Sequence, residues 1–473
     1  MAPSRVRSSN SQRKAGLLVI VFFLAAAAGL VYSSGSQQAT LGPRVLGSER
    51  LVSWAPLPAM DGDMCQWAPA SASSTLLAAF QQPRQGMPDA ASQAEVQKRA
   101  PVRMIRDDYA AYSSVAVDPV NDEVVLTDEN LFQILVYDRL DDTPPTARLT
   151  EPKRSISGLK TEIEFQCGLY IDPTSGDIYA VNNDTVDRLV IFSREAKGNV
   201  APDRALHTPH GTFGIAVDEE AQEMFLTVQH DSAVVVYPKY AEEDDAPIRL
   251  LQGDRTMLAD PHGIAVDTKN QLMFVSNYGA VSRRDPNQQN QETGGGGPTR
   301  SGRGRPNWPL ERSNAVPGSG QNLPPSISVY SLQASGDTPP LRVIQGPRTQ
   351  MDWPAHIYLD QEREELYVAN DMENSIIVFD SMASGNVAPK RVLQGPNTML
   401  KNPTGIFVDL KNDELWVANF GNRAATVYKR DASGDTAPLR VIRSGPLGEQ
   451  ALGIGNPGAV AYDSKREEIL VPN

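Results

Sequence analysis

The stretch that decides the fold is Pro403–Ile442, which reads PTGIFVDLKNDELWVANFGNRAATVYKRDASGDTAPLRVI. It contains four short apolar runs, GIFVD, ELWVAN, ATVYKR and LRVI, and polar turns rich in Gly, Asp and Asn separate them. Such short runs, rich in β-branched and aromatic residues and bounded by turn residues, are typical of β-strands and are too short for helices. The stretch therefore predicts a unit of four strands.

The same unit recurs along the chain. Its first run ends on an aspartate in seven copies, at Asp118, Asp172, Asp218, Asp267, Asp360, Asp409 and Asp463. Neighbouring aspartates are 46 to 54 residues apart, except for one interval of 93 residues that contains an insertion. A four-stranded repeat with a period of about 40 to 50 residues indicates a β-propeller, because a ring of blades buries both faces of each sheet. We predict an all-β propeller of four-stranded blades, with seven repeats counted and six blades as the alternative.

The two ends of the repeat region predict how the ring closes. The seventh copy stops at Asn473 after its second run, and RAPVRMI at Arg99–Ile105 matches the fourth run of the other copies. We therefore expect strands from both termini to complete the last blade. On this hypothesis, deleting Asp463–Asn473 unfolds the domain.

The unit at Pro403–Ile442 resembles the repeats of the NHL-type and YncE-like bacterial propellers, which belong to the broader TolB-like group. The resemblance covers residues 99–473 and implies a ring of six or seven blades. Proteins of these families include binding proteins, lactonases and lyases, so the resemblance implies a fold and leaves the function open. The Asn-His-Leu hallmark is absent from all copies, so family-specific partners do not carry over.

The N-terminus has the pattern of an export signal. Four basic residues, Arg5, Arg7, Arg13 and Lys14, precede the uncharged run Gly16–Tyr32. A basic flank followed by an apolar core sends the rest of the chain across a membrane. We assign residues 1–34 to a cleaved signal peptide or an uncleaved membrane anchor that spans with residues 16–32. The protein is then extracytoplasmic: periplasmic, on the cell surface or secreted.

Two further segments differ in composition from the repeats. Residues 35–98 are rich in Ser, Ala, Gln and Pro, and we interpret them as a low-complexity tether before a propeller at 99–473. Residues 281–325 form an insertion rich in Gly, Pro, Gln and Arg. This insertion is interpreted as a disordered loop, with a lid or a binding segment for an anionic partner as the alternative.

Charge and cysteine content limit the function classes. The formal net charge is −13 and the pI is about 5.0, which opposes a nucleic-acid partner because phosphate binding needs concentrated Lys and Arg. The two cysteines, Cys65 and Cys167, are a hypothetical disulfide outside the cytoplasm, with two buried thiols as the alternative.

Residues that recur once per copy are interpreted as architectural. The repeated aspartates are expected to accept N–H groups of the following turn. Asn370 and Asn419 are expected to cap the turn toward the third strand. An arginine recurs in the fourth run, and we expect it to pair with acidic residues of a neighbouring blade; the copies are Arg103, Arg204, Arg249, Arg342, Arg391 and Arg440.

Histidines interrupt the repeat and mark the candidate site. All five, His207, His210, His230, His262 and His356, map to the connections from fourth to first and from second to third strand. These connections share one face, because propeller strands alternate in direction. Histidine is both a frequent metal ligand and a frequent general base at neutral pH.

Two functions remain compatible with this face. The first is a binding or interaction scaffold for a protein, a peptide or a glycan, and we favour it over an enzyme. The alternative is a metal-dependent lyase or lactonase-like hydrolase, since peptidyl-hydroxyglycine lyases of similar fold hold zinc through histidines on different blades. In that case His210, His262 and His356 would hold zinc or calcium. The sequence determines neither the ligand nor the oligomeric state.

Overall fold

The computed structural model describes residues 108–183, 186–282, 284–289, 313–315, 319–449, 461–463 and 468–470. For residues 284–289, 313–315, 461–463 and 468–470 only the backbone is described. Contacts along the chain separate residues 1–98 from residues 99–473, and all the described residues belong to the second part.

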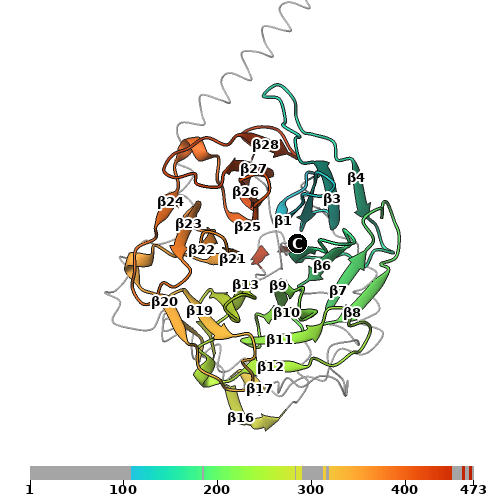
Figure 1. Ribbon diagram of the computed structural model, residues 1–473. Helices are drawn as coiled ribbons and strands as arrows, with labels where there is room; N and C mark the ends of the chain where they lie inside the picture. Colours follow the sequence, from blue (N-terminus) through green and yellow to red (C-terminus); the bar gives the residue numbers. More distant parts are fainter. Residues whose placement is uncertain are drawn as a thin grey trace, which may run out of the picture. The chain divides into compact units, whose positions relative to one another are not determined.

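Six four-stranded antiparallel sheets surround a central axis, and Figure 1 shows the first strand of each sheet innermost and the fourth outermost. Blade 1 consists of β1 (Tyr112–Asp118), β2 (Glu123–Asp128), β3 (Gln133–Asp138) and β4 (Arg154–Ser157). Blade 2 consists of β5 (Gln166–Ile171), β6 (Ile178–Asn182), β7 (Arg188–Phe192) and β8 (Arg204–His207). Blade 3 consists of β9 (Thr212–Asp218), β10 (Glu223–Val228), β11 (Ala233–Pro238) and β12 (Arg249–Gln252).

The second half of the ring has the same order. Blade 4 consists of β13 (Pro261–Asp267), β14 (Leu272–Asn277), β19 (Ser326–Ser331) and β20 (Arg342–Gln345). Blade 5 consists of β21 (Pro354–Asp360), β22 (Glu365–Asn370), β23 (Ser375–Asp380) and β24 (Arg391–Leu393). Blade 6 consists of β25 (Pro403–Asp409), β26 (Glu414–Asn419), β27 (Ala424–Lys429) and β28 (Arg440–Arg443).

The six-bladed alternative is confirmed, and counting seven copies overestimates the number of blades by one. The first and sixth blades pack directly on each other, and Val115 and Val117 of blade 1 share a core cluster with Trp416 of blade 6. The seventh copy supplies β29 (Ala461–Asp463) and β30 (Glu468–Leu470), which pair with each other in a separate two-stranded sheet. The other strand expected to close the ring, Arg99–Ile105, lies outside the described residues.

A loop of blade 1 contributes to ring closure by bonding the outer strand of blade 6. Thr143 N–H donates to Val441 O at 2.7 Å, and Thr150 N–H donates to Arg443 O at 2.9 Å. In return, Arg443 Nη2 donates to the carbonyl oxygens of Pro144 and Ala147, each at 2.8 Å. The outer strand β28 is therefore held by the connection between β3 and β4 at the opposite end of the sequence.

The turns rich in Gly, Asp and Asn join the other blades. Gly336, Gly385 and Gly434 each form a parallel bridge to the outer strand of the preceding blade. Each adopts a positive φ of 60° to 75°, which glycine adopts without strain. The next residue of the motif then caps the preceding blade, as where Asp435 Oδ1 accepts Asn397 N–H at 2.7 Å. The motif SG(D/N) is thus an inter-blade connector.

The repeated aspartates have the predicted role. Asp360 Oδ1 accepts the N–H groups of Glu362 and Arg363 at 3.0 and 3.1 Å, and Asp218 Oδ1 accepts those of two turn residues in the same way. Asn370 and Asn419 bond toward the third strand as expected, because their Nδ2 groups donate to Ser375 Oγ of β23 and Thr426 Oγ1 of β27, and their Oδ1 atoms also accept N–H groups of the connection that precedes their own blade. That connection, from the fourth strand to the next first strand, lies beside the end of the second strand.

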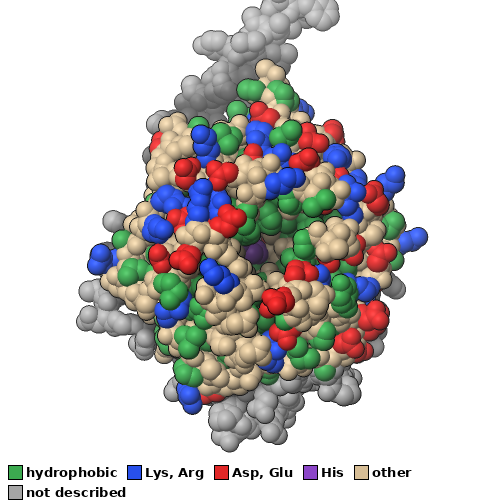
Figure 2. Space-filling view, viewed as in Figure 1, with side chains coloured by type: hydrophobic (Ala, Val, Ile, Leu, Met, Phe, Trp, Pro, Cys, Tyr) green, Lys and Arg blue, Asp and Glu red, His purple; other side chains and the backbone are tan. Residues whose placement is uncertain are grey.

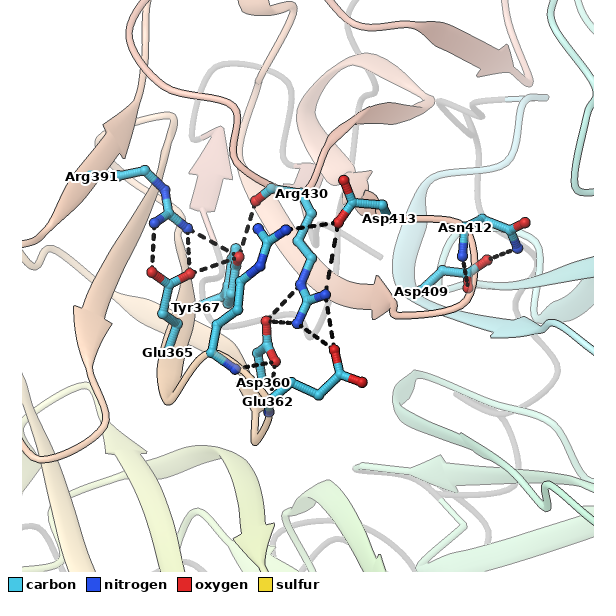
Figure 3. A network of polar contacts seen from close by, with 10 residues as sticks. Asp360, Glu362, Glu365, Tyr367, Arg391, Asp409, Asn412, Asp413 and Arg430 are labelled. Carbon is cyan, nitrogen blue, oxygen red and sulfur yellow. Dashed lines mark hydrogen bonds and ion pairs between the residues drawn. The ribbon is translucent and has the colours of Figure 1, made fainter.

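The expectation for the fourth-strand arginines is wrong for Arg249, Arg391 and Arg440, because their carboxylate partners lie in the same blade. Arg204 bonds the hydroxyl of Tyr179 in its own blade, Arg342 bonds Ser381 O of the next blade, and Arg103 lies outside the described residues. Arg391 bonds Glu365 through two nitrogens, each at 2.7 Å, and Figure 3 shows this pair beside Tyr367. Equivalent pairs within a blade join Arg154 to Glu123, Arg249 to Glu223 and Arg440 to Glu414. The fourth strand lies across its own sheet from the second strand, so these long side chains reach along one sheet face.

Neighbouring blades are instead joined by a cation that follows the third strand. Arg430 of blade 6 bonds Asp360 of blade 5 through Nε at 2.6 Å, and both side chains are buried (Figure 3). Lys239 of blade 3 pairs with Asp172 of blade 2 at 2.7 Å. Arg139 of blade 1 bonds Glu414 of blade 6 at 3.1 Å and so contributes to closure.

The insertion lies between β14 and β19. Its described parts form two small sheets: β15 (Ala280–Val281) pairs with β18 (Gln321–Asn322), and β16 (Arg284–Gln289) pairs with β17 (Ser313–Ala315). Within the described residues, no helix is long and apolar enough to cross a membrane. The run Gly16–Tyr32 and the proposed tether lie outside those residues.

Candidate functional site

Six equivalent positions encircle the axis at one end of the inner strands. Each position directly follows a second strand, and its N–H donates to the carbonyl of the residue just before the inner strand of the same blade at 2.8 to 3.2 Å. In blade order, the donors are Glu129, Asn183, Gln229, Tyr278, Asp371 and Phe420, and the acceptors are Ala111, Phe165, Gly211, Asp260, Trp353 and Asn402. We call these twelve residues the channel mouth. The backbone geometry repeats in all six blades, whereas the six donor positions carry six different side chains.

Three carboxylates of the channel mouth are held at raised pKa. Burial raises the pKa of Glu129 to about 7, and the charges of Asp128 and Asp371 add to this rise. Burial also raises the pKa of Asp260 to about 6 and raises the pKa of Asp371, where Asp352 adds a like charge. The carboxylates come from blades 1, 4 and 5, and Lys401 is the cation that opposes the rise at Asp371. The mouth is therefore an acidic site that is poorly solvated.

Aromatic rings connect the surface to the interior of the ring. Trp353 is 49% exposed, and its ring lies 5.0 Å from that of Tyr278. Tyr278 in turn stacks on His262 with centroids 3.4 Å apart and planes 10° apart. Phe213 then contacts both His262 at 4.2 Å and His356 at 5.3 Å, and so joins blades 3, 4 and 5. Figure 2 shows one face of the ring, on which a histidine lies at the bottom of a central hollow and hydrophobic side chains border part of the hollow.

His262 and His356 are neutral imidazoles inside the ring. Burial lowers the pKa of His262 to about 3 and that of His356 to about 4. His262 Nδ1 lies 2.9 Å from Asp260 O, and His356 Nδ1 lies 2.6 Å from Thr404 O. Because a carbonyl oxygen only accepts hydrogen bonds, Nδ1 carries the hydrogen in both rings and Nε2 is an acceptor.

The other three histidines have partners of their own, although the charge of His230 also contributes to the lowered pKa of His262. His207 ends β8 and pairs with Asp244 at 2.8 Å. His210 pairs with Asp187 at 2.9 Å and stacks on His230, with ring centroids 5.2 Å apart. The structure therefore divides the five predicted residues into separate groups, and only His262 and His356 share a neighbour, Phe213.

The metal hypothesis finds no support in this arrangement. The three histidines proposed as zinc or calcium ligands have separate partners: a carboxylate for His210, and carbonyls for His262 and His356. Across the part of the chain that the structure describes, no group of three or more His, Cys, Asp or Glu side chains could hold a metal ion.

Only one of the two cysteines of the proposed disulfide lies within the described residues. Cys65 lies outside the described residues, so the proposed disulfide stays a prediction. Cys167 is buried at the second position of β5, and its thiol donates to Glu129 Oε1 at 3.3 Å. This contact joins blade 2 to the carboxylate of blade 1 in the mouth.

A pocket of about 360 Å³ lies beside the mouth on blade 5. It contains two carboxylates, Asp352 and Glu373, which flank the mouth residues Trp353 and Asp371 in sequence. Its other lining residues are Gln350, Met351, Ser375 and Gln394. The acidic surface of the mouth therefore continues outward along one blade.

The carboxylates and aromatic rings of the mouth were not found by sequence reasoning, although a signal for them was present. Aligning the copies places Glu129, Asn183, Gln229, Tyr278, Asp371 and Phe420 in one column, directly after the second apolar run. The column varies from copy to copy, while the runs beside it keep their pattern. A variable column beside uniform ones indicates residues that are released from the demands of blade packing.

Comparisons with known proteins assign no family to this chain. No family model and no curated protein matches the chain, so the resemblance to NHL-type and YncE-like repeats has no match behind it. Among solved structures, hydrazine synthase of Kuenenia stuttgartiensis is 10% identical over 79% of this chain and 98% of that chain, with a TM-score of 0.43.

Two other solved structures are similar to the same degree. A nidogen/laminin complex is 12% identical over 71% of this chain and 92% of that chain, with a TM-score of 0.42. The β-propeller domain of Cps50 (Swd1) from Myceliophteria thermophila is 7% identical over 73% of this chain and 89% of that chain, also with a TM-score of 0.42. At these identities, no activity or partner transfers to this chain.

Proposed function

We propose that this protein is an extracytoplasmic binding scaffold that takes a protein or peptide partner at the channel mouth. One observation carries the proposal: six positions with the same backbone geometry present six different side chains, and one of them, Tyr278, belongs to an aromatic stack that begins at the half-exposed Trp353. Large, half-exposed aromatic side chains beside a concave site are the usual anchors of protein interfaces.

The location outside the cytoplasm is part of the same proposal. It is supported by the basic flank and the apolar run Gly16–Tyr32, which together have the pattern of an export signal. An exported propeller presents its channel mouth to proteins of that compartment.

The proposal is tested by crosslinking from the mouth in living cells. A photoreactive amino acid replaces Trp353 in the full chain, and a second version carries it at Leu410, which is exposed in the turn after Asp409 at the other end of the blades. We expect mass spectrometry to identify one protein adduct that forms from position 353 and is absent from position 410. Equal adducts from both positions, or a glycan as the sole adduct, would overturn a protein-binding mouth.

A further inference from the structure

We infer that the channel mouth binds a lysine or arginine side chain of its peptide partner, with the charged end among Glu129, Asp260 and Asp371 and the stem along Tyr278 and Trp353. This inference rests on the proposed function and names the chemistry of the partner.

The first argument is the balance of charge at the mouth. Glu129, Asp260 and Asp371 are coupled through Tyr278, whose hydroxyl has its pKa raised by burial and by the charges of all three. The two buried histidines add no positive charge, because burial keeps His262 and His356 neutral. A bound cation would favour the ionised form of each carboxylate and so offset the repulsion between them.

The second argument is an acceptor without a donor. The side chain of His262 is 4% exposed, and the stacked rings of Tyr278 and Phe213 enclose it. Its Nδ1 hydrogen is used by Asp260 O, and its Nε2 lone pair has no hydrogen-bond partner among the described residues. Because His262 Nε2 is not among the fully buried atoms that lack a partner, it keeps some accessible surface and can accept an N–H group of a ligand.

The third argument is that several acceptors here have no hydrogen-bond donor among the described residues. Glu129 uses Oε1 for the Cys167 thiol, and Asp371 uses Oδ1 for the Asn402 amide at 3.0 Å. The second carboxylate oxygens and His262 Nε2 can therefore accept hydrogen bonds from a ligand. Lysine and arginine are the side chains that offer several donors and no acceptor.

The fourth argument is the shape of the entrance. The ring of Trp353 is tilted 31° to that of Tyr278 and forms a half-exposed aromatic wall. Such walls favour ammonium and guanidinium groups and the alkyl stems that carry them. The acidic pocket on blade 5, with Asp352 and Glu373, lies where the next residues of a basic segment would continue.

Fluorescence anisotropy with defined peptides tests the inference on the full chain. The probes are labelled nonapeptides of Gly and Ser that differ only in the central residue, which is arginine, lysine, citrulline or acetyl-lysine. We expect arginine or lysine to bind about tenfold or more tightly than its neutral counterpart, because the lost hydrogen bonds are charge-assisted. Equal binding of the charged and neutral peptides would overturn the inference.

Variants of the protein locate the binding. The double variant Glu129→Gln and Asp371→Asn is expected to lose about tenfold in affinity for the charged peptide, and Trp353→Phe to retain more affinity than Trp353→Ala. The matched control is Glu220→Gln, which removes an exposed carboxylate from the turn after Asp218 at the other end of the blades. An equal loss in the control would mean general attraction to an acidic protein and would overturn the site.

The two proposals fail separately. If position 353 still forms its protein adduct in cells but the charged peptides show no preference, the cationic anchor is wrong and the binding scaffold stands. If the charged peptides bind at the mouth but no protein adduct forms from position 353, the chemistry stands and the protein partner is wrong.

Discussion

The two ends of the inner strands carry contrasting rings of residues. At one end, six aspartates close the first strand of the six blades, and they cap the same kind of turn in every blade. At the other end, the six mouth positions share one backbone hydrogen bond and no two share a side chain. A residue that every blade needs for its own folding repeats, whereas residues that face a common space around the axis are free to differ. The contrast separates architecture from candidate function within one chain.

The six aspartates differ in whether the following blade supplies a positively charged partner. Asp360 and Asp172 receive a buried cation from the following blade, through Arg430 and Lys239. Asp267 is equally buried but forms no ion pair among the described residues, and it caps only its own turn. The same residue type therefore has two energetic roles, which the following predictions distinguish.

The largest expected effect is at Asp360. Asp360→Asn should lower the free energy of unfolding by about 3 to 5 kcal/mol, because it leaves the Arg430 charge buried without its main partner. Asp267→Asn should cost about 1 to 2 kcal/mol, since only turn hydrogen bonds weaken. Urea denaturation measures both, and equal losses would show that the inter-blade cation adds nothing.

A glycine inside the inner strands tests how tightly the blades abut. A Cβ at Gly263 would lie 2.5 Å from Ala355 O and 2.8 Å from His356 Cα, both of which belong to the backbone of the next blade. We expect Gly263→Ala to cost about 1 to 3 kcal/mol, since backbone atoms cannot rotate away. Ser114→Ala, at the equivalent position of β1, is the control and should cost less than about 1 kcal/mol. Unchanged melting of Gly263→Ala would mean that the blades separate easily.

The carboxylates of the mouth should lower the free energy of unfolding as the pH rises, whereas a carboxylate in a stabilising ion pair raises it. The pKa of Glu129 is raised from 4.5 to about 7, so the folded chain holds this proton more tightly than the unfolded chain, and its contribution to stability is lost as the pH rises through 7. Glu129→Gln removes this loss. We expect the variant to gain about 1 to 3 kcal/mol on the parent between pH 5 and pH 8, measured by urea denaturation. Parallel stability curves for the two proteins would contradict a strained carboxylate.

The smallest effect on stability is expected at Trp353. Its side chain is half-exposed and contacts Tyr278 from the solvent side, so Trp353→Ala should change the free energy of unfolding by less than about 1 kcal/mol. The same variant should weaken the binding of the arginine peptide. A loss of stability as large as that of Asp360→Asn would place Trp353 with the architecture and not with the binding surface.

The sequence by itself determined the blade. Strand length, turn chemistry and the aspartate that follows each first run depend on neighbours within a few residues, so one copy at Pro403–Ile442 predicts four strands and the capped turn. The histidine pattern also points to the end of the inner strands at which the channel mouth lies. It did not lead to the residues that lie together there, since His207 and His210 belong to contacts of their own.

Only the tertiary structure decided the number of blades, the closure and the composition of the mouth. The seventh copy has the local pattern of the others, yet closure depends on how blade 1 packs on blade 6, including the bond from Thr143 to Val441. The same holds for Glu129, Asp260, Tyr278, Trp353 and Asp371, which come from three blades and meet only when the ring closes. The raised pKa values of the three carboxylates and of the Tyr278 hydroxyl arise from burial among residues distant in sequence, and a pattern of local neighbours carries no information about such burial.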